Sequence, residues 1–264
     1  MTRSASLGSS SIHPFLQHDG ILAFAHRGDQ DSGPENTLVA FEGAVRLGFR
    51  YLETDLQSTR DGVLLVFHDA RLDRVTDQQG RIDRLDWATV RRARVGGTEP
   101  IARFEELLGE FPQVRVNIDP KSDAAMELLV DAIRRTGSEG RVCVGCFSDR
   151  RLKRFRAALP GVCTSMGRSE ATRARLHSLG WPLPPGGAAC AQVPVGWHGL
   201  PLVDARFVAA MRQRGLQVHV WTVNEPEQMH RLLDLGVDGL MTDRPAVLKE
   251  VLAQRGLWHD SASP

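Results

Sequence analysis

The sequence predicts an α/β protein, a (β/α)8 TIM barrel with a small insertion after the second strand region. Short runs of apolar and β-branched residues alternate with longer amphipathic segments from residue 21 to residue 253. About eight such repeats fit in the 264 residues, a length close to the ~250 residues typical of this barrel. Glycine follows several of the amphipathic segments, where the end of a helix favours it.

The elements are expected in the following order. Strands are expected at 21–25, 51–57, 115–119, 142–147, 162–165, 188–193, 217–223 and 239–243. Helices are expected at 37–47, 104–108, 124–135, 149–158, 204–214, 225–235 and 246–253. Thr242-Asp243-Arg244-Pro245 is typical of a helix start, with proline in the first turn. Residues 167–187 are rich in Pro and Gly and favour no regular element.

One segment interrupts the alternation after the second strand. Arg60-Asp61-Gly62 is typical of a hairpin turn, so residues 63–68 should run back along that strand. Residues from about 69 to 101 are rich in Arg and Asp with weak periodicity, which predicts a small insertion. The predicted divisions are then a flexible N-terminal segment at 1–20, a single barrel domain at 21–255 and a C-terminal tail at 256–264.

Composition and charge exclude several classes of protein. The 33 basic and 32 acidic side chains give a net charge of +1, without the basic excess of a nucleic-acid-binding protein. The longest apolar run, residues 62–67, is far shorter than a membrane span, and the first twenty residues lack the apolar core of a signal peptide. We expect a soluble, cytoplasmic protein with a small-molecule partner, no nucleic acid and no integral membrane segment. Its oligomeric state is left open.

The four cysteines are too few for a disulfide scaffold. Cys143 and Cys146 form a CxxC motif, but it lies in an apolar segment that is typical of a buried strand. Because no second CxxC and no nearby His pair completes a zinc site, this spacing favours a structural role over metal or redox chemistry.

Charged residues interrupt the second and third predicted strands, where a parallel barrel should be nearly continuously apolar. Glu53 and Asp55 share one face because strand side chains alternate, and Asp119 and Lys121 share one face in the same way. These positions fall at carboxyl ends of strands, where barrel enzymes assemble their sites. Three carboxylates without cysteine favour a hard divalent cation, Mg²⁺ or Ca²⁺. The alternative is a structural salt-bridge network of Glu53 and Asp55 with Arg27 and Lys121.

His26 and His68 also fall at strand ends beside charged residues. Imidazole titrates near neutral pH, so these two are the candidates for proton transfer, although a single histidine is more often structural. Arg27 and Lys121 would supply positive charge for an anionic group such as phosphate. Trp221, at the end of the seventh strand, is either core or the wall of a pocket. His219, inside an apolar strand, is expected in the core.

Seven motifs in order resemble the glycerophosphodiester phosphodiesterase family over residues 21–253. They are Ala25-His26-Arg27-Gly28, Pro34-Glu35-Asn36-Thr37, Leu52-Glu53-Thr54-Asp55, Phe67-His68-Asp69, Asp119-Pro120-Lys121, Val220-Trp221-Thr222-Val223-Asn224 and Gly236-Val237-Asp238-Gly239. Each motif alone is weak, whereas seven in this order and spacing are specific.

The resemblance implies the following chemistry. One divalent cation, Mg²⁺ or Ca²⁺, would be held by Glu53, Asp55 and Asp119. His26 and His68 would be the general acid and base: His26 would deprotonate the attacking glycerol hydroxyl and His68 would protonate the leaving alcohol, or the reverse. Arg27 and Lys121 would contact the phosphate, and Trp221 would line the glycerol end of the pocket. Many members carry Glu where this chain has Asp119, which is one methylene shorter.

The implied reaction is metal-dependent hydrolysis of glycerophosphodiesters to glycerol 3-phosphate and an alcohol. Within the same resemblance, lysophospholipase D-like cleavage of a lipid phosphodiester is an alternative, and it would need an apolar groove beside the site. A barrel that binds a phosphorylated ligand without turnover is an alternative of another class, against which the full set of histidines and carboxylates argues.

Overall fold

The computed structural model describes residues 12–182, 186–197 and 199–258, and the segments 1–11 and 259–264 of the predicted termini lie outside these ranges. Eight parallel strands form the barrel in the order β8-β7-β6-β2-β1-β13-β12-β9. Their bounds are β1 (Leu22–His26), β2 (Tyr51–Ser58), β6 (Arg115–Pro120), β7 (Val142–Val144), β8 (Cys163–Thr164), β9 (Cys190–Pro194), β12 (Gln217–Trp221) and β13 (Gly239–Thr242). A single isolated parallel bridge, Ser165 to Cys190, joins the two ends of this order. The barrel is therefore nearly closed, with a seam between β8 and β9.

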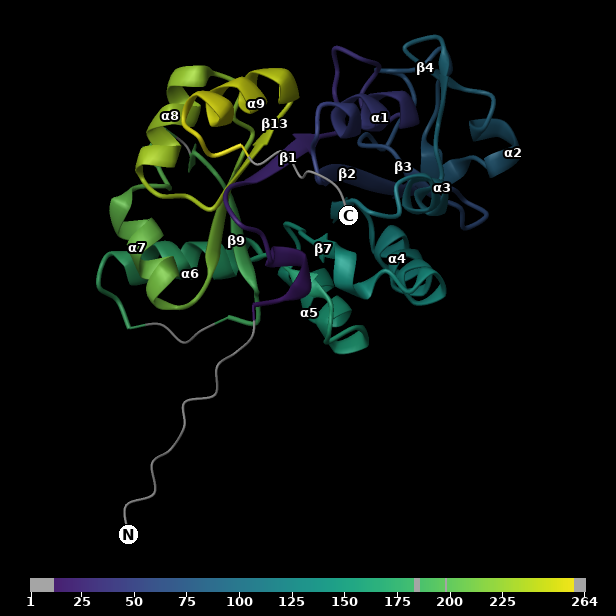
Figure 1. Ribbon diagram of the computed structural model, residues 1–264. Coiled ribbons are helices and arrows are strands. Elements are labelled where there is room, and N and C mark those ends of the chain that lie inside the picture. The colour runs from purple at the N-terminus through teal and green to yellow at the C-terminus, as the bar shows by residue number, and fades with distance from the viewer. Residues whose placement is uncertain (1–11, 183–185, 198, 259–264) are drawn as a thin grey trace.

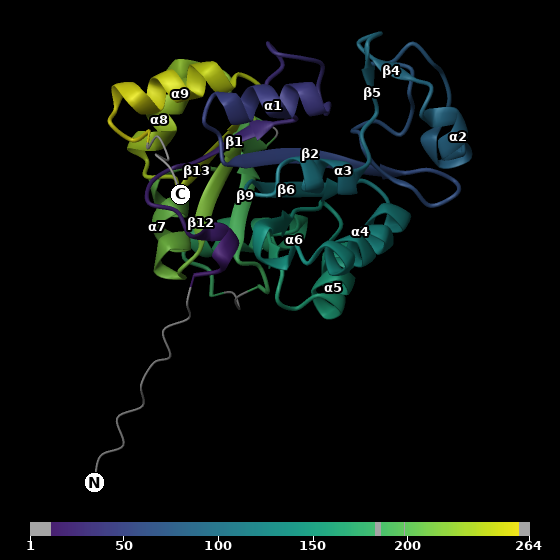
Figure 2. The same cartoon turned by 45° about the vertical axis from the view of Figure 1, so that its right-hand side comes forward.

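The helices surround the strands, as Figures 1 and 2 show. Their bounds are α1 (Leu38–Arg46), α3 (Phe104–Glu110), α4 (Asp123–Thr136), α5 (Asp149–Ala158), α6 (Arg168–Ser178), α7 (Ala205–Gln213), α8 (Pro226–Asp234) and α9 (Pro245–Gln254). The (β/α)8 barrel is thus confirmed. Helix α6 occupies the stretch in which the sequence favours no element. A short hairpin of β10 (Gly196–Trp197) and β11 (Leu200–Pro201) precedes α7.

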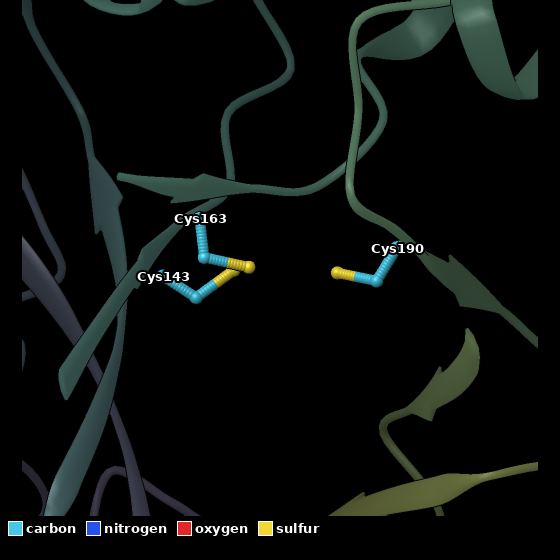
Figure 3. Close-up of side chains that lie close together, drawn as sticks. All are labelled: Cys143, Cys163 and Cys190. Atoms are coloured by element: carbon cyan, nitrogen blue, oxygen red, sulfur yellow. The ribbon is translucent and has the colours of Figure 1, made fainter. Parts of the chain in front are cut away.

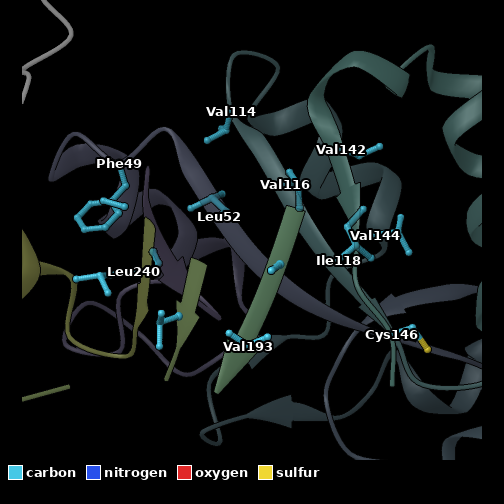
Figure 4. Close-up of a cluster of buried hydrophobic side chains, with 14 of the residues drawn as sticks. Phe49, Leu52, Val114, Val116, Ile118, Val142, Val144, Cys146, Val193 and Leu240 are labelled. Atoms are coloured by element: carbon cyan, nitrogen blue, oxygen red, sulfur yellow. The ribbon is translucent and has the colours of Figure 1, made fainter. Parts of the chain in front are cut away.

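The main core lies between the strands and the helices (Figure 4). Leu52, Val116 and Val144 are fully buried there, on three neighbouring strands. Because strand side chains alternate, the residues between them face the barrel interior. The alternation therefore separates an apolar outer layer, which holds the helices, from an interior that is free to carry chemistry.

The predicted insertion forms a small unit with its own core. Strand β3 (Leu64–Val66) runs antiparallel to β2, as the hairpin turn predicts. The chain then passes through α2 (Trp87–Val90) and an antiparallel pair, β4 (Arg94–Val95) and β5 (Glu99–Pro100). The buried apolar residues of this unit form a separate cluster, and Figures 1 and 2 both show α2 and β4 at the edge of the molecule.

The part of the N-terminal segment that the structure describes is packed against the barrel. The one-turn 3-10 helix η1 (Pro14–Leu16) places Phe15, which is completely buried, against the rings of Phe24 and Tyr51. The Tyr51 hydroxyl donates a 3.0 Å hydrogen bond to the Phe15 carbonyl. Tyr51 is the first residue of β2, so η1 covers the barrel at the amino ends of the strands, and the packed chain begins before residue 21.

Candidate active site

All eight predicted site residues line one pocket of about 420 Å³ at the opposite end of the barrel, a size suited to a small molecule. Glu53 and Asp55 lie within β2, and the other six come from strand ends or from the loops that follow them. The eight are His26, Arg27, Glu53, Asp55, His68, Asp119, Lys121 and Trp221.

Strand register brings the acidic residues together. His26 on β1 is paired with Glu53 on β2, and Asp55 on β2 is paired with Asp119 on β6. Glu53 and Asp55 are two residues apart and both line the pocket, so the predicted alternation places them on one face.

The loop after β1 is held in an uncommon conformation. Arg27 and Asn36 have φ angles of 62° and 59°, in the left-handed region that costs a non-glycine residue roughly 1–3 kcal/mol. The Arg27 N–H donates to the Glu53 carbonyl at 3.0 Å, and the Asn36 N–H donates to the Arg27 carbonyl at 2.9 Å. Gly28 has φ 90°, and a Cβ there would lie 2.7 Å from the Ala40 backbone. These constraints fix where the Arg27 side chain enters the pocket.

Two cations surround Asp55. Lys121 Nζ lies 2.7 Å from a carboxylate oxygen of Asp55 and 2.7 Å from one of Asp119, and Arg27 Nε lies 3.0 Å from the other Asp55 oxygen. Burial alone would raise the pKa of Asp55, but Lys121 and Arg27 outweigh it and lower that pKa. For Asp119, burial outweighs Lys121 and raises the pKa. Part of the salt-bridge alternative is therefore present in the structure.

Glu53 is the exception to this pairing. Its side chain is buried, and its Oε2 has no hydrogen-bond partner among the described residues. The nearest cationic candidate is His26, whose Nε2 lies 3.6 Å from Oε2. Burial raises the pKa of Glu53 to about 8, although His26 opposes the shift. A buried carboxylate oxygen without a partner is costly, so this group needs a proton or a cation.

His26 is held by a carboxylate that the sequence pattern did not single out. Its Nδ1 lies 2.5 Å from Asp243 Oδ1. Asn224 donates to the second Asp243 oxygen at 2.8 Å and accepts the Asp243 N–H at 2.9 Å. Burial alone would lower the pKa of His26, but Glu53 and Asp243 outweigh it and raise that pKa. Asp243 occupies Nδ1, which leaves Nε2 available on the Glu53 side.

His68 has the same arrangement on the other side of the pocket. Its Nδ1 lies 2.5 Å from Asp69 Oδ1. Arg74, from the insertion, donates to Asp69 at 2.5 Å and to both oxygens of Glu35 at 2.9 and 2.7 Å. The hydrogen bond from Arg74 is the main reason that the pKa of Asp69 falls to about 2. Glu35 in turn accepts from Arg27 at 3.0 Å, so a chain of ion pairs links the two sides of the pocket.

Part of the remaining wall is apolar, and Arg168 and Gln192 are among the polar residues that also line it. Phe147 stands edge-on to Trp221, with ring centroids 5.8 Å apart, and is 61% exposed. Trp221 is half-buried: it lines the pocket and also packs against a buried core cluster, so both interpretations of this residue hold in part. His219 is completely buried, as predicted. A substrate with a polar, anionic part and a less polar part would match both walls.

Sequence patterns missed three residues of this site: Asp243, Asp69 as a partner of His68, and Arg74. The helix start at 242–245 is confirmed, with Pro245 in the first turn of α9, but its N-cap is Arg244 and the Asp243 side chain contacts His26 instead. Of these three residues, only Asp69 could have been found from the sequence, because it directly follows His68. Arg74 lies in the insertion without any periodic pattern.

Two Asp–His pairs, three carboxylates and two cations at this end of the barrel place the protein in the class of (β/α)8 barrels with an enzyme-like site. Residues 26–247 match the family model of the glycerophosphoryl diester phosphodiesterase family. The chain therefore belongs to that family and is an enzyme, a phosphoric diester hydrolase.

The first two of the following proteins agree with this assignment, and the third shares the fold. The chain is 41% identical, over 95% of its length and 98% of the relative's, to a probable glycerophosphodiester phosphodiesterase 2 of Mycobacterium tuberculosis. A putative glycerophosphoryl diester phosphodiesterase from Silicibacter pomeroyi matches with a TM-score of 0.77 at 25% identity, over 94% of this chain and 98% of that one. A phosphodiesterase from Oleispira antarctica, solved with the product sn-glycerol-3-phosphate, matches with a TM-score of 0.74 at 21% identity, over 89% and 97% of the two chains.

Among the residues that the structure describes, none of the helices has the length and apolarity needed to cross a membrane.

Proposed function

We propose that this enzyme hydrolyses glycerophosphodiesters to glycerol 3-phosphate and an alcohol, with a divalent cation and with His26 and His68 as proton-transfer groups. The observation that carries the proposal is the pair of Asp-bound histidines that share one pocket with Arg27 and Lys121. The relative from Oleispira antarctica binds glycerol 3-phosphate in the same fold, which supports this product.

The carboxylates fit a hard cation by their chemistry. Glu53, Asp55 and Asp119 offer only oxygen, the donor that Mg²⁺ and Ca²⁺ prefer. The salt-bridge network accounts for Asp55 and Asp119, but it leaves the buried Glu53 Oε2 without a partner. Among the described residues, oxygens of these three carboxylates do not all lie within 4.8 Å of one another, so a cation held by all three would require the side chains to move closer. Bound there, it would satisfy the Glu53 oxygen. When bound, it would neutralise negative charge on the phosphate and polarise its oxygens.

Arg27 and Lys121 bind the phosphate in this proposal. Both are already oriented by carboxylates, Arg27 by Asp55 and Glu35, and Lys121 by Asp55 and Asp119. Side chains that are fixed before the substrate arrives lose little further freedom on binding and stabilise developing charge in place.

The histidines move protons in two steps. One imidazole takes the proton of the glycerol 2-hydroxyl as its oxygen attacks phosphorus, and the other protonates the leaving alcohol as the P–O bond breaks. This first step leaves a cyclic phosphate on the glycerol. In the second step water opens this ring, and the two histidines exchange the roles of acid and base. Asp243 and Asp69 hold the Nδ1 atoms, so each ring presents Nε2 in a fixed orientation.

The apolar wall supports a second candidate substrate, a lysophospholipid. Phe147 and Trp221 form one side of the pocket, and Phe147 is largely exposed at its mouth. An acyl chain would gain from contact with these rings, whereas a small polar alcohol would not.

The test is release of glycerol 3-phosphate from a panel of glycerophosphodiesters, with Mg²⁺, Ca²⁺ or a chelator in parallel. We expect release with one or both metals and its loss in chelator, restored by adding metal. Full activity in exhaustive chelator would overturn the cation site. Cleavage of lysophospholipids without cleavage of any deacylated substrate would move the function to the lipid alternative, and no cleavage of either would contradict the proposed reaction.

A further inference from the structure

Three of the four cysteines point toward one another inside the barrel (Figure 3). Cys143 lies on β7, Cys163 on β8 and Cys190 on β9, and their Sγ atoms all lie within 4.8 Å of one another. None is more than 1% exposed. Cys143 does not pair with Cys146, the partner that the CxxC spacing suggests. We refer to Cys143, Cys163 and Cys190 as the thiol cluster.

Strand register places the thiol cluster across the seam of the barrel. Cys143 is paired with Cys163 on the neighbouring strand, and Cys190 takes part in the isolated bridge to Ser165 that joins β8 to β9. Elsewhere around the barrel, each neighbouring pair is held by two or more register pairs. The three sulfurs therefore converge where the backbone contributes least to closing the barrel.

We propose that the thiol cluster is a three-coordinate binding site for a soft, thiophilic metal ion, with Cu(I) as the ion that fits it best, and that the bound ion closes the seam. Thiolate ligands select soft ions such as Cu(I) and zinc. Zinc takes four ligands in structural sites, and the described His, Cys, Asp and Glu side chains supply only three at this place. This inference does not depend on the proposed function.

The surroundings suit a bound ion rather than three separate thiols. Phe15, Leu22, Phe24 and Met241 pack in the same cluster and keep water away. Gln192 Nε2 lies 3.9 Å from Cys143 Sγ, where an N–H can face negative charge on sulfur, as second-shell groups do in metal sites. Binding would displace thiol protons to solvent.

This site is chemically distinct from the carboxylate site above it. Sulfur ligands favour soft ions and carboxylates favour Mg²⁺ or Ca²⁺, so one ion does not serve both sites equally. Gln192 lies between the two, because it lines the active-site pocket and donates to Asn117 at 2.8 Å while facing Cys143.

The experiment uses the full-length chain under anaerobic, reducing conditions, titrated with Cu(I) or with Zn²⁺ and then freed of loosely bound ion by a chelating resin. We expect wild type to retain one copper per chain and to gain roughly 5 °C in thermal midpoint. Cys146→Ser is the matched control, since Cys146 is buried but outside the thiol cluster, and it should behave like wild type. Cys143→Ser and Cys190→Ser should lose both the copper and the gain.

X-ray absorption at the copper edge of the wild-type protein decides the case if the variants fold poorly. A first shell of three sulfurs supports the proposal, and a shell of nitrogen or oxygen overturns it. Equal copper retention by wild type and Cys143→Ser, or retention by neither, also overturns it. Retention of zinc but not copper, lost only in the thiol-cluster variants, would overturn the choice of Cu(I).

Discussion

At one end of the barrel interior, strands β1, β2 and β6 carry charged side chains. At the other end, β1 and β2 carry aromatic rings, and β7, β8 and β9 carry the thiols. Strand β2 begins with Tyr51, packed on Phe15, and contributes Glu53 and then Asp55, four residues after Tyr51, to the pocket. Strand β1 changes in the same way, from Leu22 to His26. Side chains on the interior face of a strand lie two residues apart, so four residues along a strand are enough to pass from the apolar core to the active site.

The two ends of the barrel also differ in backbone strain and in unsatisfied polar groups. Left-handed backbone at Arg27 and Asn36 and the unpartnered oxygen of Glu53 all lie at the charged end. The other end has aromatic contacts and a completely buried Phe15. Strain of this kind persists only when the surrounding structure fixes it, and the packed end of the barrel supplies that support.

The largest effect is expected from replacing the two pocket histidines, which should lower activity without lowering stability. His26→Ala and His68→Ala should each reduce kcat by roughly 10²–10⁴-fold, because each removes one proton-transfer group. The thermal midpoint should stay close to that of wild type, because both side chains lie at the pocket and not in the apolar core. Steady-state kinetics and a thermal melt on each variant measure the two effects.

His177→Ala serves as the control, since His177 lies on α6 outside the pocket and should keep both properties. If both pocket variants lost stability in proportion to activity, these histidines would be structural, and the contrast between the two ends of the barrel would fail.

A smaller effect concerns the completely buried His219 and acid stability. Burial lowers its pKa from 6.5 to about 3 in the folded protein. Between these values the unfolded chain binds a proton that the folded chain does not, so the free energy of unfolding falls as pH falls, by at most about 1.4 kcal/mol per pH unit. The slope is half its maximum at pH 6.5 and fades over roughly one further pH unit above it.

His219→Gln should remove this part of the slope, because an amide does not titrate but still reaches the partners of the ring, Gln192 and Gln217. The measurement is urea denaturation at several values between pH 7 and pH 4.5, read as a slope and not as an absolute stability. Equal slopes in wild type and variant would show that His219 already takes up its proton in the folded state.

Much of the charged end was predictable from sequence because its signal is local. Glu53 and Asp55 interrupt one apolar strand at a spacing of two, and Asp119 does the same in the next barrel strand. Strand alternation alone then puts them on the interior face, and the parallel arrangement puts them at the same end.

The contacts that the sequence did not reveal join distant residues. His26 and Asp243 are 217 positions apart, and only closure of the barrel brings β1 beside β13. The thiol cluster depends on register across β7, β8 and β9 in the same way. Helix α6 was missed for a different reason, because its buried residues are only Ala174 and Glu170, the latter paired with Arg156 at 2.8 Å. An ion pair at the core replaces the apolar stripe by which a helix is recognised.

The smallest expected effect tests whether the insertion supports the charged end. Arg74 is the one described residue of the insertion that bonds both Asp69, the partner of His68, and Glu35, the partner of Arg27. Arg74→Lys keeps the charge but loses the planar fork that reaches both carboxylates, so His68 should be held less well. We expect kcat to fall roughly tenfold, about 1.4 kcal/mol in activation free energy, with KM nearly unchanged.

Arg71→Lys is the matched control, since Arg71 also lies in the insertion but pairs only with Asp73, at 2.9 Å, among the ion pairs of the described residues. A merely structural role for Arg74 would lower the thermal midpoint of Arg74→Lys and leave kcat per folded enzyme unchanged. A positioning role instead predicts a lower kcat at an unchanged midpoint, with a further loss in Arg74→Ala, in which no cation faces Asp69. The split between kcat and the thermal midpoint therefore decides whether the insertion only covers the barrel or orients a histidine of its active site.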